Sequence, residues 1–147
     1  MLAAPAPAQS EPRNGIAPRL DAGTVAADVE RLPHTLLGWC GADGLPEVVP
    51  AGVQGAGAGG VVIRAPRGKV PAGGRRAGLT SHMFQPKMIG QEQRVHTGWL
   101  SAGDDGTITY APHSRAGYRL PPSKIVYTIG CAALTARRRA ARNAGYG

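Results

Sequence analysis

Aromatic and acidic residues are scarce in this chain of 147 residues. Aromatic side chains make up 5% of the sequence while glycine reaches 22 residues, so a hydrophobic core is built mainly from Val, Leu, Ile and Ala. Asp and Glu together number 9 against 17 Lys and Arg, which leaves a net charge of +8. Carboxylates this few and scattered argue against a hydrolase that works with a carboxylate pair.

Cysteine is nearly absent as well. Cys40 and Cys131 are the only two, and no pair of Cys or His residues has the spacing of a metal site, so we expect reduced, buried thiols and no bound metal. No apolar run approaches the ~20 residues that a membrane-spanning helix needs. The opening MLAAPAPAQSEPRNG has neither a basic start nor a continuous apolar stretch, which predicts no signal peptide and a cytoplasmic protein.

Length and composition predict one domain with two flanking segments. Residues 1–19 are rich in Ala and Pro and are expected to form a disordered arm. Residues 20–130 carry short β-branched runs separated by Gly and Pro, which is typical of a β-rich fold. Residues 131–147 are expected to form a basic helix or tail, because no acidic residue follows Asp105 while several arginines do.

The pattern of short runs predicts a mainly β barrel of about six antiparallel strands with a short helix at each end. The leading helix begins at Asp21 or Thr24 and stops before Pro33. Glycines in residues 54–59 predict a turn, and Pro46 and Pro50 predict that the second strand lies at an edge or carries a bulge. The strands are expected at residues 34–40, 45–53, 61–65, 76–83, 95–101 and 107–111, and the trailing helix at 132–143.

A basic loop lies within the stretch GVVIRAPRGKVPAGGRRAGLTS, residues 60–81. Guanidinium forks and the backbone N–H groups that glycine leaves accessible are suited to a phosphate. We therefore expect a phosphorylated cofactor at this loop; the alternative is a basic loop that is only solvated. Adjacent strand residues point to opposite faces, so at most one of a neighbouring pair points inward. The basic candidates are Arg67, Lys69, Arg75 and Arg76.

Hydroxyl, indole and imidazole groups supply the remaining candidates. Thr80 and Ser81 are possible donors to a phosphate or ring, and Trp99 either stacks on a ring or fills the core. A neutral imidazole can hydrogen-bond the edge of a ligand ring or carry a proton, although a purely structural histidine is the commoner case. The first two histidines are predicted to face each other across neighbouring strands. The catalytic candidates are His82, His96 and His113.

Two segments together resemble the flavin-binding split β-barrel superfamily. They are HTLLGWCGADGLPEVVPAGV and VVIRAPRGKVPAGGRRAGLTSH. That superfamily includes pyridoxamine 5′-phosphate oxidase-like proteins and deazaflavin (F420)-dependent reductases. The resemblance implies FMN or F420 as cofactor, oxidation or reduction of a small organic molecule, and a homodimer with the cofactor between subunits. The sequence departs from the pattern at residues 73–76, Gly-Gly-Arg-Arg, where relatives often carry Ser-Arg-Lys or Lys-x-x-Asn.

Two other functions remain open on the sequence. One is a non-enzymatic barrel that binds nucleic acid or another anion through the basic loop and the C-terminal arginines. The scarcity of aromatic side chains for base stacking argues against nucleic acid as the partner. The other is a protein that stores or senses flavin or heme without turnover, with one of the three histidines as heme ligand.

Overall fold

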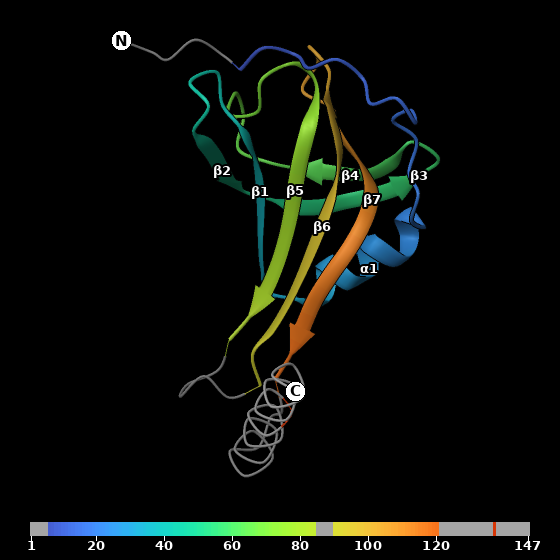
Figure 1. Ribbon diagram of the computed structural model, residues 1–147, viewed down its shortest axis with the longest axis vertical. Helices are drawn as coiled ribbons and strands as arrows, with labels where there is room; N and C mark the ends of the chain where they lie inside the picture. Colours follow the sequence, from blue (N-terminus) through green and yellow to red (C-terminus); the bar gives the residue numbers. More distant parts are fainter. Residues whose placement is uncertain (1–5, 85–89, 121–136, 138–147) are drawn as a thin grey trace, which may run out of the picture. The chain divides into compact units, whose positions relative to one another are not determined.

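The structure is a computed structural model that describes residues 6–84, 90–120 and 137 of the chain. Its fold is mainly β, as predicted, with seven antiparallel strands in one curled half-barrel sheet and one short helix (Figure 1). The strand order across the sheet is β2-β1-β5-β6-β7-β4-β3. The elements are α1 Ala22–Arg31, β1 His34–Cys40, β2 Pro46–Pro50, β3 Gly52–Gly57, β4 Gly60–Arg64, β5 Gly73–Met83, β6 Glu92–Ala102 and β7 Ile108–Arg119.

The chain divides into two compact units. The first combines Met1–Met83 with Gln93–Gly117 and holds the helix and nearly all of the sheet. The second combines Phe84–Glu92 with Tyr118–Gly147. In its described part, the Leu120 N–H donates to the Gln91 carbonyl oxygen at 2.6 Å. No helix in the described part of the chain is long and apolar enough to cross a membrane.

The leading helix forms where the sequence predicts it. Asp21 is its N-cap, and the Asp21 carboxylate accepts a 2.8 Å hydrogen bond from the Thr24 N–H. This bond and a second one from the Thr24 hydroxyl lower the pKa of Asp21. Val25 and Val29, four residues apart, are buried and hold α1 against β3 and β4. The helix ends at Arg31, two residues before Pro33.

The middle of the sheet differs from the prediction. The expected strand at 45–53 is two strands, β2 and β3, separated by Ala51, and the expected glycine turn at 54–59 is mostly strand. The backbone of β3 pairs with β4 from Gly52 opposite Arg64 to Gly57 opposite Gly60, with an irregularity in the register after Val53. Glycine weakens a strand locally, but the hydrogen bonds from β4, which follows directly in a hairpin with Gly57 opposite Gly60, offset that cost.

Two other expectations concern the C-terminal half. The last predicted strand, 107–111, is β7, which runs from Ile108 and continues eight residues beyond the predicted end, to Arg119. Of the trailing helix predicted at 132–143, only Arg137 lies among the described residues; it is helical and exposed. The rest of that helix and the basic tail lie outside the described residues.

Side-chain alternation divides the central strands into an inner and an outer face. The inner face of β5 carries Arg75, Ala77, Leu79 and Ser81, all buried. The core that it joins is made mostly of aliphatic residues, with two large aromatic side chains, in keeping with the composition. Its largest members are Leu37, Trp39, Val61, Ile63, Leu79, Leu100 and Tyr110.

Candidate functional site

The two adjacent arginines of β5 point to opposite faces, as strand geometry requires. Arg75 is fully buried on the inner face, whereas Arg76 is exposed on the outer face. The guanidinium of Arg75 is bonded to backbone carbonyls: Nη1 donates to Ala6 at 2.8 Å, and Nη2 donates to Ala72 at 2.6 Å and to Pro71 at 3.1 Å. These bonds make Arg75 a structural residue of the inner face and leave Arg76 as the arginine of this pair that is available to a ligand.

The N-terminal segment, for which the sequence predicts disorder, is held against the sheet at two points. At one end, the Gln9 N–H donates to the Gly74 carbonyl at 2.8 Å, and Gln9 Oε1 accepts from the Arg76 N–H at 3.0 Å. At the other end, the N–H groups of Arg19 and Leu20 both donate to the Pro112 carbonyl on β7. We call residues 9–20 the strap, because they run from β5 to β7 past one end of the strands (Figure 1).

A turn shapes the strap between its two anchors. The Gly15 N–H donates to the Pro12 carbonyl at 2.9 Å, and Gly15 has a φ of +78°. The turn thus holds Gly15 in a left-handed backbone conformation that only glycine adopts at little cost, and any side chain there would be strained. The turn therefore sets how Arg13 and Asn14, the two residues between Pro12 and Gly15, lie over the sheet.

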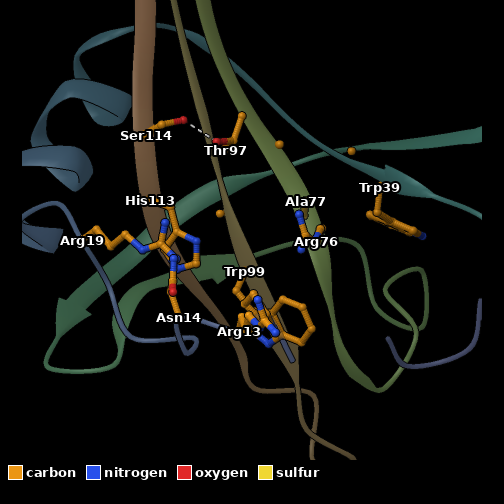
Figure 2. Close-up of a pocket in the computed structure, with 14 residues that line it drawn as sticks. Arg13, Asn14, Arg19, Trp39, Arg76, Ala77, Thr97, Trp99, His113 and Ser114 are labelled. Carbon is orange, nitrogen blue, oxygen red and sulfur yellow. Dashed lines mark hydrogen bonds between the residues drawn. The ribbon is translucent and has the colours of Figure 1, made fainter. Parts of the chain in front are cut away.

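A cavity of about 640 Å³ lies between the strap and the outer face of the sheet (Figure 2). Part of its floor is Gly38 of β1 and Gly78 of β5, which are direct partners in the sheet. Two facing residues without side chains expose bare backbone, which allows a flat ligand to approach closely. The full lining is Pro12, Arg13, Asn14, Arg19, Gly38, Trp39, Arg76, Ala77, Gly78, Thr97, Gly98, Trp99, His113 and Ser114.

The charges around this cavity are all of one sign. Arg13 and Arg19 come from the strap and Arg76 from β5, and no Asp or Glu is part of the lining. Within residues 6–84 and 90–120, none of these three guanidinium groups is paired with a carboxylate. Unpaired guanidinium groups around one cavity attract and bind anions.

Trp99 forms an aromatic wall of the cavity. Its side chain is almost fully buried, although it projects from β6 on the side where the strap lies. Gly74 makes this position possible, because a Cβ atom there would lie 2.7 Å from Cζ2 of the indole. The prediction for Trp99 allowed either a ring-stacking or a core position; the indole is buried and lines the cavity at the same time.

Of the three candidate histidines, only His113 lines the cavity. Its Nε2 atom is buried and has no hydrogen-bond partner in the described part of the chain. Figure 2 shows its ring next to the side chains of Arg19 and Asn14. Nearby, the hydroxyl groups of Thr97 and Ser114 are hydrogen-bonded to each other.

The other two histidines do not face each other. His82 pairs with His34 of β1, and the two rings stack with centroids 5.2 Å apart. His96 is fully buried in the core, and burial lowers the pKa of its imidazole. The Leu79 backbone lies near the His96 ring, but neither ring nitrogen has a well-formed hydrogen bond within the described residues. His96 is therefore a core residue that packs in its neutral form.

The remaining predicted site residues lie away from the cavity. Arg67 and Lys69 are exposed on the loop between β4 and β5, and Arg67 lines a different hollow, together with Asp105. Thr80 is half-buried on the outer face of β5 without lining the cavity, and Ser81 is buried on the inner face. The basic loop and the cavity are thus separate features.

The strap residues Arg13, Asn14 and Arg19 are the part of the site that sequence reasoning misses. The Ala and Pro content of residues 1–19 points to disorder and hides the two arginines within it. The available signal was the position of the prolines: Pro12 precedes Arg13 directly, and Pro18 precedes Arg19 directly. Proline fixes φ and stiffens the chain, which favours a defined path for the residues beside it.

The described part of the chain holds no metal-binding cluster and one free cysteine. No cluster of three or more His, Cys, Asp or Glu residues suited to a metal occurs among the described residues. Cys40 is exposed at the end of β1, so the expectation that it is buried is wrong. The other cysteine, Cys131, lies outside the described residues.

Comparison of the chain with known protein families, with curated proteins and with solved structures finds no match.

Proposed function

We propose that this protein binds a phosphorylated flavin or deazaflavin, FMN or F420, in the cavity under the strap and acts as an oxidoreductase on a small organic molecule. The observation that carries the proposal is the combination of an unpaired Arg76, an indole wall at Trp99 and a bare glycine floor around one cavity. Its volume of about 640 Å³ falls within the range of ~300–1,000 Å³ that is usual for cofactor sites.

The residues that line the cavity fit the phosphate and the ring system of such a cofactor. Arg76 offers a guanidinium fork to the phosphate. Gly38 and Gly78 leave space for a planar ring system over the sheet, and Trp99 offers an aromatic surface beside it. When bound, the flavin or deazaflavin supplies the two-electron chemistry, and the protein supplies binding, orientation and electrostatics. In this role His113, with a buried Nε2 atom, is the group placed to hold or donate a proton.

The proposal includes a homodimer. Leu36 is 38% exposed and Val48 is 57% exposed. Register places Leu36 opposite Pro50 and Val48 opposite Gly38, so all four lie on the outer face of β1 and β2. Since β2 is an edge strand, this apolar surface lies beside an unpaired edge, and a second copy of the chain would cover both. Light scattering should give twice the 15.1 kDa chain mass; a monomer with cofactor bound would contradict the dimer.

The visible absorption spectrum of the freshly purified protein tests the cofactor. Flavin, deazaflavin and heme have distinct bands, and titration of the colourless protein with FMN and F420 covers the case in which cofactor is lost during purification. Arg76→Ala should weaken binding about tenfold or more, because one charge-assisted hydrogen bond contributes roughly 1.5–3 kcal/mol. Arg67→Ala removes the same charge from the exposed loop and should leave affinity unchanged.

Each alternative function has a distinct outcome in these measurements. Absence of saturable binding by both FMN and F420 would refute the proposal. A heme spectrum would favour the storage or sensor function, with His113 as the candidate ligand at the cavity. Tight binding of one defined oligonucleotide at physiological salt, with no cofactor bound, would favour the nucleic-acid function.

A further inference from the structure

We infer that the strap is the specificity element of this site, and that it selects small ligands carrying at least two negative charges, of the phosphate monoester or diphosphate class. The inference rests on the proposed function in taking the cavity as the ligand site, but it does not depend on a flavin ring. Two of the three guanidinium groups at the cavity, those of Arg13 and Arg19, come from the strap, and the sheet alone contributes only Arg76.

The strap is fixed at both ends beside the groups that it complements. Its first anchor involves the backbone of Arg76 itself, which donates to Gln9 Oε1 at 3.0 Å. Its second anchor is the Pro112 carbonyl, one residue before His113. The two anchors therefore hold the strap next to Arg76 at one end and next to His113 at the other, so that the span carrying Arg13 lies between two ligand-facing groups of the sheet.

The first anchor is itself supported from the core. The buried Arg75 guanidinium donates to the Ala6 carbonyl at 2.8 Å, three residues before Gln9. This bond fixes the chain leading into the strap without using any group that faces the cavity. Both anchors are hydrogen bonds within the protein itself, so ordering of the strap ends does not require contacts to a ligand.

The charge count defines the ligand class. Three guanidinium groups with no carboxylate among the lining residues repel one another until an anion binds. An anion with a single negative charge compensates only part of this repulsion. A phosphate monoester dianion or a diphosphate compensates more and offers several acceptor oxygens to the guanidinium forks. The preference for multiply charged ligands should therefore depend on the two strap arginines.

Calorimetric titration of the full-length protein with inorganic pyrophosphate and with inorganic phosphate tests this inference. The wild-type protein should bind pyrophosphate more tightly than phosphate. The double variant Arg13→Ala/Arg19→Ala should lose about tenfold or more in pyrophosphate affinity and less in phosphate affinity. The matched control, Arg67→Ala/Lys69→Ala, removes the same charge from the exposed loop and should change either affinity less than about twofold, since distant surface charges are screened.

Hydrogen exchange supplies a second measurement on the unmodified protein. Pyrophosphate should slow exchange at the strap amides between the two anchors, and the loop of Arg67 and Lys69 should not respond. Equal losses in the strap and loop variants, no loss in the strap variant, or unchanged strap exchange at saturating pyrophosphate would each overturn the inference.

The outcomes separate this inference from the proposed cofactor. If pyrophosphate binding depends on Arg13 and Arg19 but neither FMN nor F420 binds, the strap remains the specificity element and the proposed flavin or deazaflavin cofactor is refuted. If FMN or F420 binds with an affinity that Arg13→Ala/Arg19→Ala leaves unchanged, the cofactor proposal stands and the strap is refuted as the specificity element.

Discussion

Nη1 of Arg75 donates a hydrogen bond to the carbonyl oxygen of Ala6 at 2.8 Å, joining the inner face of β5 to a residue 69 positions earlier in the chain. Arg75→Met keeps a long apolar side chain but leaves the carbonyls of Ala6, Ala72 and Pro71 without this donor. The free energy of unfolding should fall by about 2–4 kcal/mol, as expected when a buried hydrogen-bonded charge is removed. Urea unfolding measures it.

The Arg75 variant should also loosen the chain leading into the strap. Hydrogen exchange near Gln9 should accelerate more than exchange at the β1–β5 pairing, because the Ala6 bond is lost while the sheet remains. Arg67→Met, an exposed loop position, is the control and should change neither quantity measurably. A stability loss below about 0.5 kcal/mol for Arg75→Met, within the range of ordinary surface changes, would contradict the structural role of Arg75.

Gly74→Ala should displace the Trp99 indole. The added Cβ would lie 2.7 Å from Cζ2 and 2.9 Å from Nε1 of that side chain, which is closer than van der Waals contact allows. We expect a loss of about 1–3 kcal/mol in stability and a change in tryptophan fluorescence, together with weaker ligand binding at the cavity. Gly57→Ala has open space around the added carbon and serves as the control; identical spectra for both variants would count against the contact.

The neutral His96 imidazole should make stability depend on pH. Burial holds the pKa of His96 below its ordinary value of 6.5; Asp28 on α1 opposes this shift, whereas Arg115 on β7 and Arg94 on β6 reinforce it. The unfolded state therefore binds more protons as the pH falls below 6.5, and the free energy of unfolding decreases there, whereas it is fully retained above that value.

His96→Leu should remove this part of the pH dependence. Urea unfolding at about pH 7.5 and about pH 5.5 should show a smaller difference for the variant than for the wild-type protein. Gly57→Ala, which has open space around the added carbon and changes no titratable group, should keep the wild-type difference. An unchanged pH dependence in His96→Leu would show that another group is responsible.

Tyr110→Phe should destabilise the sheet modestly. The Tyr110 hydroxyl is buried and lies 3.0 Å from both the Ala77 and the His96 carbonyl oxygens, on β5 and β6. Burial raises the pKa of Tyr110 far above its ordinary value, so the hydroxyl remains a donor at every working pH. Its loss should lower the free energy of unfolding by about 1–3 kcal/mol. Tyr118→Phe, at an exposed position, should have no comparable effect, and equal costs would refute the assignment.

The fold class and many local elements follow from the sequence alone. The Asp21 cap and the spacing of Val25 and Val29 predict α1, and the observed helix matches them. Likewise, the gap between the predicted strands 34–40 and 45–53 is a turn, in which Gly44 has a φ of +81° and its N–H donates to the Gly41 carbonyl. These features depend on neighbouring residues and on the conformations that each residue type allows, so they can be recognised along the chain.

Strand pairing and tertiary contacts decided the rest. Residues 52–57 form a strand because the next segment, β4, pairs with them, despite a glycine content that predicts a turn. Two adjacent arginines are alike in sequence, yet Arg75 is buried and donates to the carbonyl of the distant Ala6, while Arg76 lines a cavity. The strap arginines face that cavity because Gln9 and Arg19 bond to strands far along the chain. Local composition determines which conformations a segment favours; only tertiary hydrogen bonds and burial determine which groups meet.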